Sequence, residues 1–150
     1  MKLKMIAAAL ALAACTPAPS DTAAPAPPAA PSPEVASQEL LAALTPVMAQ
    51  DLGQPVSFTI ETVRIDNDWG WLVVQPQTEA GGAIDWAATK YAVQAAEGVL
   101  DGGGRTYALL KRQNGLWRVV DFVVGPTDVA YGDWPARHGA PPELLGLSAE

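Results

Sequence analysis

Apolar residues recur every three or four positions between residues 34 and 52, which predicts one amphipathic helix. Ser32 followed by Pro33 is typical of an N-cap and the first helical position, and Gly53 is typical of a C-terminal cap. Thr45-Pro46 predicts either a kink or a restart of the helix at that point. The expected buried face consists of Leu40, Leu41, Leu44, Val47, Met48 and Leu52.

After the helix, the apolar period changes from about four to two, which is typical of strands. Residues 56–65 alternate between apolar and polar side chains, with a change of phase near Thr62 that predicts a bulge. Asp66-Asn67-Asp68 is a turn sequence. Residues 69–75 then predict a second strand, and the apolar run in it indicates burial on both faces.

Two further strands, over residues 106–112 and 116–124, flank Gln113-Asn114-Gly115. An Asn-Gly pair between apolar runs is a strong hairpin signal. Between the two hairpins, residues 77–104 predict a short helix that Asp85 caps and that contains Trp86, Tyr91 and Val93. Residues 125–147 predict turns and short helical pieces.

Together these elements predict an α+β fold, in which an N-terminal helix packs on a curved antiparallel sheet of about four strands arranged as two hairpins. The order of elements over residues 34–124 resembles that of cystatin-like and NTF2-like folds. Such folds include enzymes, ligand binders and subunits of membrane-bound assemblies, so the resemblance implies a fold and selects no activity.

The N-terminus has the pattern of an export signal. Two lysines precede an apolar run over residues 5–11, which is too short to cross a bilayer. Leu12-Ala13-Ala14-Cys15 resembles the lipobox of bacterial lipoproteins. That resemblance implies cleavage before Cys15, diacylglycerol on its sulfur and an N-terminal acyl chain, which together make a stable anchor. An ordinary secretory signal beside a cysteine is the alternative.

Three regions follow from this pattern: a signal peptide over residues 1–14, a lipid anchor with a linker over 15–33, and one α+β domain over 34–150. The linker is rich in alanine and proline and carries no large apolar side chain. Such a composition predicts disorder with extended polyproline conformations. It serves as a tether or is unselected filler.

Removal of the signal takes away two of the nine basic side chains and leaves all 16 acidic ones. An acidic surface repels phosphate backbones, so we expect no nucleic-acid partner and membrane attachment through the lipid alone. Cys15 is the only cysteine, which excludes a disulfide or thiolate nucleophile once it is lipidated. Thr16, rather than Asp, follows it, which resembles the outer-membrane sorting pattern and favours the outer over the inner membrane.

Few residues indicate catalytic chemistry. His138, the only histidine, is a candidate base together with Asp128 or Asp133, but no activated nucleophile or oxyanion hole accompanies it. A surface histidine at a helix end is the competing interpretation. Asp66-Asn67-Asp68 begins like a calcium-binding loop, but the spacing of oxygen ligands and the distal glutamate of such a loop are absent. Gly102-Gly103-Gly104 is not followed by the Gly-Lys-Ser/Thr of a phosphate-binding loop. We therefore predict no metal and no cofactor.

The densest polar and aromatic cluster follows the last strand. Its candidate ligand-binding residues are Asp121, Thr127, Asp128, Tyr131 and Trp134. They converge on a pocket at the mouth of the sheet, or the segment is a structured tail that closes the core. The five tryptophans either stack on a ligand or pack in the core, and core packing is expected for at least three of them.

Three functional hypotheses follow. The first is a membrane-anchored envelope lipoprotein whose non-enzymatic domain binds another envelope protein or a cell-wall component, or supports an assembly. The second is a small-molecule binder with a pocket between helix and sheet. The third is a small hydrolase or isomerase centred on Asp128 and His138.

Overall fold

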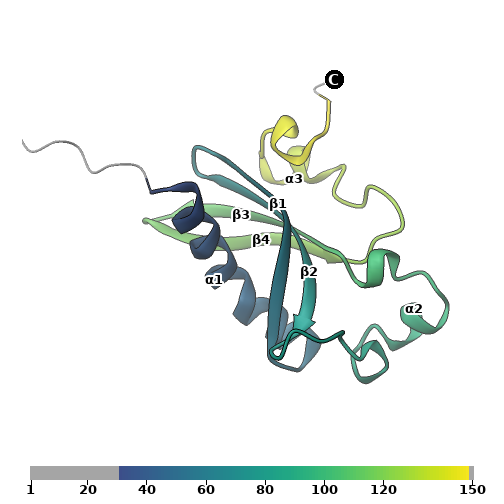
Figure 1. Ribbon diagram of the computed structural model, residues 1–150. Helices are drawn as coiled ribbons and strands as arrows, with labels where there is room; N and C mark the ends of the chain where they lie inside the picture. The colour runs from purple at the N-terminus through teal and green to yellow at the C-terminus, as the bar shows by residue number, and fades with distance from the viewer. Residues whose placement is uncertain (1–30, 149–150) are drawn as a thin grey trace, which may run out of the picture. The chain divides into compact units, whose positions relative to one another are not determined.

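The computed structural model of the chain describes residues 31–148. The predicted signal peptide, the lipid anchor at Cys15 and most of the predicted linker lie outside these residues. Within them the fold is α+β: one long helix packs against an open, four-stranded antiparallel sheet (Figure 1). The predicted fold class is confirmed.

The long helix α1 spans Pro33–Leu52. The hydroxyl of Ser32 accepts a hydrogen bond from the Val35 N–H at 3.4 Å, and Gly53 ends the helix with a left-handed φ of 69°. The helix runs without interruption across Pro46, so the predicted restart does not occur. Thr45 does not cap a second helix, because its hydroxyl donates to the Leu41 carbonyl at 2.7 Å.

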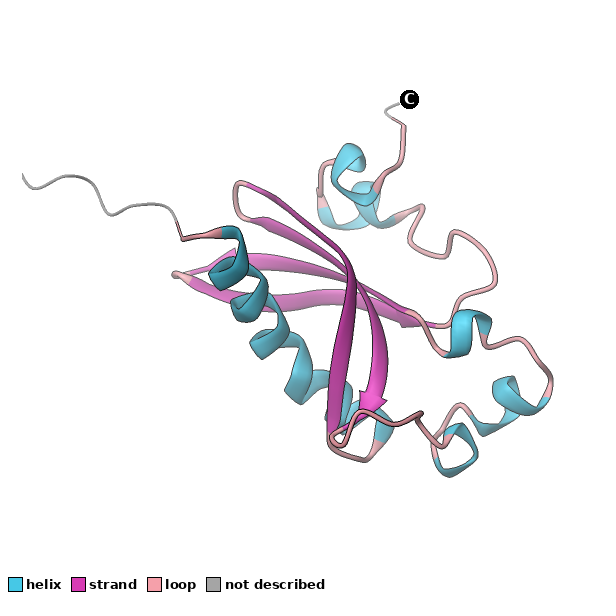
Figure 2. Cartoon of the chain, viewed as in Figure 1, coloured by secondary structure: helices cyan, strands magenta, loops and turns pink. Residues whose placement is uncertain are grey.

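The sheet follows the chain in the order β1-β2-β3-β4, as two hairpins joined through β2 and β3 (Figure 2). Its strands are β1 (Val56–Asp66), β2 (Trp69–Thr78), β3 (Thr106–Gln113) and β4 (Leu116–Val124). The predicted bulge in β1 is confirmed, because the register with β2 shifts between Ile60 and Thr62. A second bulge in β4, opposite Leu109 and Leu110 of β3, has no counterpart in the predictions.

The segment between the hairpins forms three short helical pieces instead of one helix. The carboxylate of Asp85 accepts a hydrogen bond from the Ala87 N–H at 3.1 Å and caps the 3-10 turn η1 (Trp86–Ala88). Helix α2 (Ala92–Ala96) and a second 3-10 turn, η2 (Asp101–Gly103), follow. Glycines at positions 98 and 102–104 adopt positive φ and break the helical pattern.

Two hydrophobic cores lie on the two faces of the sheet. The first joins α1 to the sheet through Leu40, Leu44 and Met48 of the helix and Leu72, Val74, Ala108 and Leu110 of the strands, all fully buried. The second lies under the C-terminal segment, which contains α3 (Trp134–His138) and the 3-10 turn η3 (Pro142–Leu145). The sheet is therefore covered on both faces.

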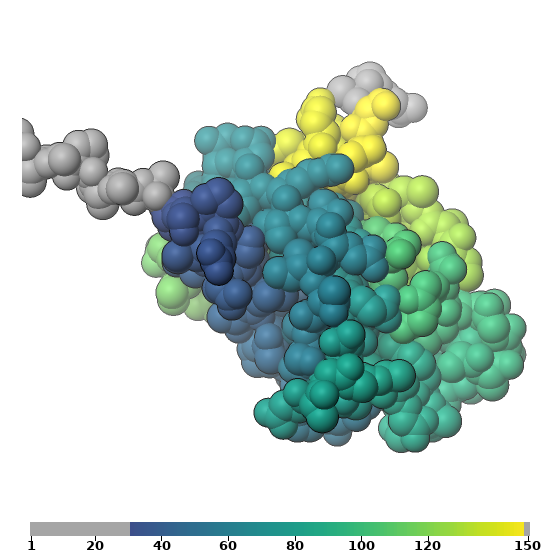
Figure 3. All heavy atoms as spheres, in the orientation of Figure 1, coloured from purple at the N-terminus to yellow at the C-terminus, as the bar shows by residue number. Residues whose placement is uncertain are grey.

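The C-terminal segment lies beside the β1–β2 hairpin, where its atoms adjoin those of the strands (Figure 3). The Arg64 guanidinium on β1 donates to the Leu144 carbonyl at 3.2 Å. The predicted turns and short helical pieces of the tail are confirmed. Among residues 31–148, no helix has the length and apolar character needed to cross a membrane.

Candidate functional site

Four aromatic side chains gather where the tail covers the sheet. Tyr131 stacks on Tyr107 of β3 with ring centroids 4.9 Å apart, and it also lies 5.0 Å from Trp71 of β2. Trp134 meets the edge of Trp71 at 6.0 Å. Burial and the neighbouring Tyr107 raise the pKa of Tyr131, and the nearby Arg64 opposes that shift. These rings fill the second core.

His138 lies at the end of α3 and contacts the edge strand β4. Its Nε2 atom is 2.9 Å from Oδ2 of Asp121, and the same oxygen is 3.3 Å from the Arg137 guanidinium. The other oxygen of Asp121 accepts the Phe122 N–H at 2.9 Å. Both carboxylate oxygens are thus engaged, and the histidine and the arginine connect the tail to the strand.

The structure brings together only some of the residues predicted for this site. Asp121, Tyr131, Trp134 and His138 all lie between the sheet and the tail, whereas Thr127 and Asp128 are exposed in the loop that precedes them. The partner of His138 is Asp121 rather than Asp128 or Asp133. Trp134 is only 2% exposed, so its ring belongs to the core and offers no surface to a ligand.

The tryptophans divide between the two cores. Trp71, Trp117 and Trp134 are buried, which confirms core packing for three of the five. Trp86 packs against the core beneath α1, and Trp69 packs against the second core. Lys111 lies over the ring of Trp69, 4.3 Å from its centroid. Among residues 31–148, Trp117 is the one tryptophan whose indole nitrogen is fully buried and has no hydrogen-bond partner.

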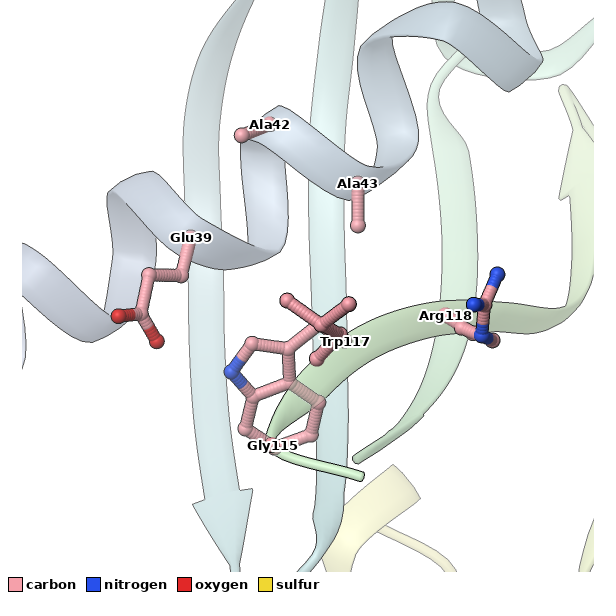
Figure 4. Close-up of a pocket in the computed structure, with 7 residues that line it drawn as sticks. Glu39, Ala42, Ala43, Gly115, Trp117 and Arg118 are labelled. Carbon is pink, nitrogen blue, oxygen red and sulfur yellow. The ribbon is translucent and has the colours of Figure 1, made fainter. Parts of the chain in front are cut away.

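A surface groove of about 350 Å³ runs between the first half of α1 and the turn that joins β3 to β4 (Figure 4). We call it the hairpin groove. Its floor combines the small side chains of Ala42 and Ala43 with the indole of Trp117, and Leu116 at its rim is 63% exposed. It is lined by Glu39, Ala42, Ala43, Gly115, Leu116, Trp117 and Arg118.

The indole nitrogen of Trp117 is buried and finds no hydrogen-bond acceptor among residues 31–148. The guanidinium of Arg112 lies over the same ring, 4.5 Å from its centroid, and its Nε atom is also buried without a partner. A buried N–H that lacks an acceptor costs about 1–3 kcal/mol. Of these two residues Trp117 lines the hairpin groove and Arg112 does not.

Charges of opposite sign flank the groove. Figure 4 shows Glu39 and Arg118 on opposite sides of Trp117, with the indole nitrogen on the edge of the ring toward Glu39. Both charged side chains are exposed, and neither forms an ion pair within residues 31–148. The β3–β4 hairpin is locally basic, since no acidic residue lies between Asp101 and Asp121.

Pro46 removes one hydrogen bond from the part of α1 that borders the groove. In a helix the carbonyl of residue 42 would accept a hydrogen bond from the N–H of residue 46, but Pro46 has none to donate. Ala42 is exposed and lines the groove. Ala42, whose carbonyl lacks its usual helical donor, therefore lines the same groove as Trp117.

Other hollows in the described part of the chain have simpler explanations. One is bordered by Asp51 of α1, whose carboxylate pairs with Lys90 and accepts the Tyr91 hydroxyl at 2.7 Å. Burial, followed by the hydrogen bond to Asp51, raises the pKa of Tyr91 above its ordinary range. These groups satisfy one another and fasten the segment between the hairpins to the helix.

Another hollow lies in the tail, and no charged side chain lines it. Within residues 31–148, no group of three or more His, Cys, Asp and Glu side chains is placed to hold a metal ion. Neither Asp121 nor His138 lines the hairpin groove or these two hollows. The groove was not predicted from the sequence, where Trp117 and Arg118 are indistinguishable from other residues of a half-buried strand.

Comparison of the chain with protein-family models, with curated proteins and with solved structures finds no match.

Proposed function

We propose that this protein is a lipid-anchored lipoprotein of the cell envelope, held at the outer membrane, whose domain binds another envelope component without chemical turnover. The lipobox-like sequence Leu12-Ala13-Ala14-Cys15 supports the anchor. The alanine- and proline-rich sequence that follows suits a tether between membrane and domain. The partner is an envelope protein or a cell-wall component.

The observation that carries the binding role is the unpartnered indole N–H of Trp117 in the hairpin groove. Polar groups at the floor of a largely apolar groove orient a ligand and give it specificity. Glu39 and Arg118 add unpaired charges at its sides. The groove thus offers hydrophobic contact, a directed donor and charge selectivity in one place.

The geometry favours binding over catalysis. His138 and Asp121 contact each other and Arg137 at the joint between the tail and the sheet, and this structural role accounts for both residues. A hydrolase would place its base beside a nucleophile and a substrate pocket. The hydrophobic and aromatic residues around His138 and Asp121 belong to the second hydrophobic core.

The anchor is tested by replacing Cys15 with alanine in the full chain. We expect the wild-type protein to fractionate with membranes at the mass of the acylated form, and C15A to lose both properties. A C15A protein that keeps its acylated mass and its membrane fraction would contradict the proposal.

The binding role is tested by site-specific photo-crosslinking in living cells. A photoreactive residue at position 42, in the groove, is expected to capture one identified envelope component. The same residue at Val129, which is 56% exposed in the tail, serves as the control. The R118Q substitution should reduce the crosslink from position 42. Equal capture from both positions, or none from position 42, would contradict a binding role for the groove.

A further inference from the structure

The hairpin groove has the features of a site for a short peptide with free ends. This inference rests on the proposed binding function and names the ligand. The groove presents, in one place, a hydrogen-bond donor, an acceptor, a carboxylate and a guanidinium. A peptide has the complementary set: a main-chain carbonyl, a main-chain N–H, an ammonium group and a carboxylate.

The donor fixes the position of the ligand. Trp117 is 8% exposed, and its N–H lacks an acceptor among the described residues. Because this N–H is buried, a main-chain carbonyl in the groove would reach it through a local rearrangement and would then remove the cost of leaving it unpaired. The Arg112 guanidinium packs on the ring, 4.5 Å from its centroid, and holds the indole in place.

The acceptor and the small side chains set the shape of the ligand. Pro46 frees the carbonyl of Ala42 to accept an amide N–H, so the groove can pair with both polar groups of an extended backbone. Ala42 and Ala43 leave room for backbone atoms to approach the helix closely. A ligand with small side chains, such as alanine, fits a groove of about 350 Å³.

The charges set the polarity of the ligand. Glu39 and Arg118 lie on opposite sides of Trp117 and have no ion-pair partner within residues 31–148. We propose that the hairpin groove binds a short zwitterionic peptide, with its ammonium group at Glu39, its first carbonyl on the Trp117 N–H and its carboxylate at Arg118. Charge-assisted hydrogen bonds at both ends give such a ligand its orientation.

The test is calorimetric titration of the full-length, lipidated protein in detergent micelles with trialanine and its blocked forms. We expect saturable binding of trialanine. N-acetylation and C-terminal amidation should each weaken binding about two- to fivefold, which is the size expected for loss of one ion pair at the exposed side chains of Glu39 and Arg118. Absence of binding, or equal binding of the free and doubly blocked peptides, would overturn the proposal.

Surface variants separate recognition from folding. In E39Q, N-acetylation of the peptide should no longer weaken binding, whereas amidation should weaken it as in wild type. In R118Q, amidation should no longer weaken binding, whereas N-acetylation should. E97Q, an exposed charge-matched change beyond the groove, should alter neither. If E39Q and E97Q affect binding alike, Glu39 does not hold the ammonium group. If position 42 captures a partner in cells but trialanine does not bind, the peptide inference falls and the binding function stands. If both experiments fail, both proposals fall.

Discussion

Nε2 of His138 lies 2.9 Å from Oδ2 of Asp121, and this contact joins α3 to the edge strand β4. The bulge in β4 makes the contact possible. Leu109 of β3 lies opposite Asp121 and Leu110 lies opposite Val119, so Val120 is the extra residue. The shift of phase turns Asp121 toward the tail, whereas regular alternation from Trp117 would direct it toward α1.

We predict that H138A destabilises the domain modestly. Both side chains are about one-fifth exposed, so solvent screens their interaction, and the expected loss in the free energy of unfolding is about 1 kcal/mol. Urea unfolding of wild type, H138A, D121A and the double variant measures the coupling between the two residues. Strictly additive losses in the double variant would show that the pair has no energetic connection.

W134A should be far more damaging. Trp134 is 2% exposed and packs against Trp71 and Tyr131, so truncation leaves a cavity that costs about 3–5 kcal/mol. V129A changes an exposed residue of the same segment and should alter stability by about 0.5 kcal/mol or less. Denaturant midpoints compare the two variants. Similar midpoints would mean that the tail contributes little to the folded domain.

Gly104 and Gly53 form a matched pair, because both have positive φ. A methyl group at Gly104 would lie 1.9 Å from the Trp86 ring, whereas one at Gly53 meets nothing within 4 Å. Both alanine variants incur backbone strain of about 1–2 kcal/mol. G104A should cost about 1–3 kcal/mol more, since Trp86 must also move. Thermal unfolding of both variants measures the difference. Equal losses of stability in G104A and G53A would contradict the position of the Trp86 ring against Gly104.

The Tyr91–Asp51 hydrogen bond predicts a dependence of stability on alkaline pH. The unfolded chain releases the phenol proton near pH 10, but burial and Asp51 raise the pKa of Tyr91 in the folded protein. The folded state therefore holds this proton more tightly, and its advantage is lost as pH rises above about 10. Wild type should be more stable than Y91F at pH 7, and this difference should shrink above pH 10. A difference that stays constant to pH 11 would rule out this linkage.

The sequence was sufficient to predict the elements whose pattern is local. Neighbouring residues determine each of these features: the period of α1, its caps at Ser32 and Gly53, the Asn-Gly turn and the bulge in β1. The bulge in β4 escaped prediction because residues 116–124 are apolar on both faces, so a change of phase leaves little trace. The division of residues 77–104 into three short helical pieces depends on glycines with left-handed φ, and the sequence alone does not distinguish these glycines from those of ordinary turns.

One part of the candidate site was also predicted from the sequence, and another part was not. The polar and aromatic pattern predicted one cluster, made of Asp121, Thr127, Asp128, Tyr131 and Trp134. The fold places Asp121, Tyr131 and Trp134 between the sheet and the tail, and His138, predicted separately, contacts Asp121 there. The hairpin groove depends instead on the packing of α1 against the β3–β4 turn, more than 70 residues away in the chain. That packing leaves the Trp117 N–H without a partner, which no local pattern reveals.

The most direct test of the groove as a peptide site is the indole N–H spectrum of the full-length protein labelled with 15N-tryptophan. W117F identifies the Trp117 signal by its disappearance. Trialanine should shift the Trp117 signal downfield, as formation of a new hydrogen bond requires, and should leave the signals of Trp71 and Trp134 in place. A Trp117 signal that stays fixed at saturating peptide would contradict the groove as the peptide site.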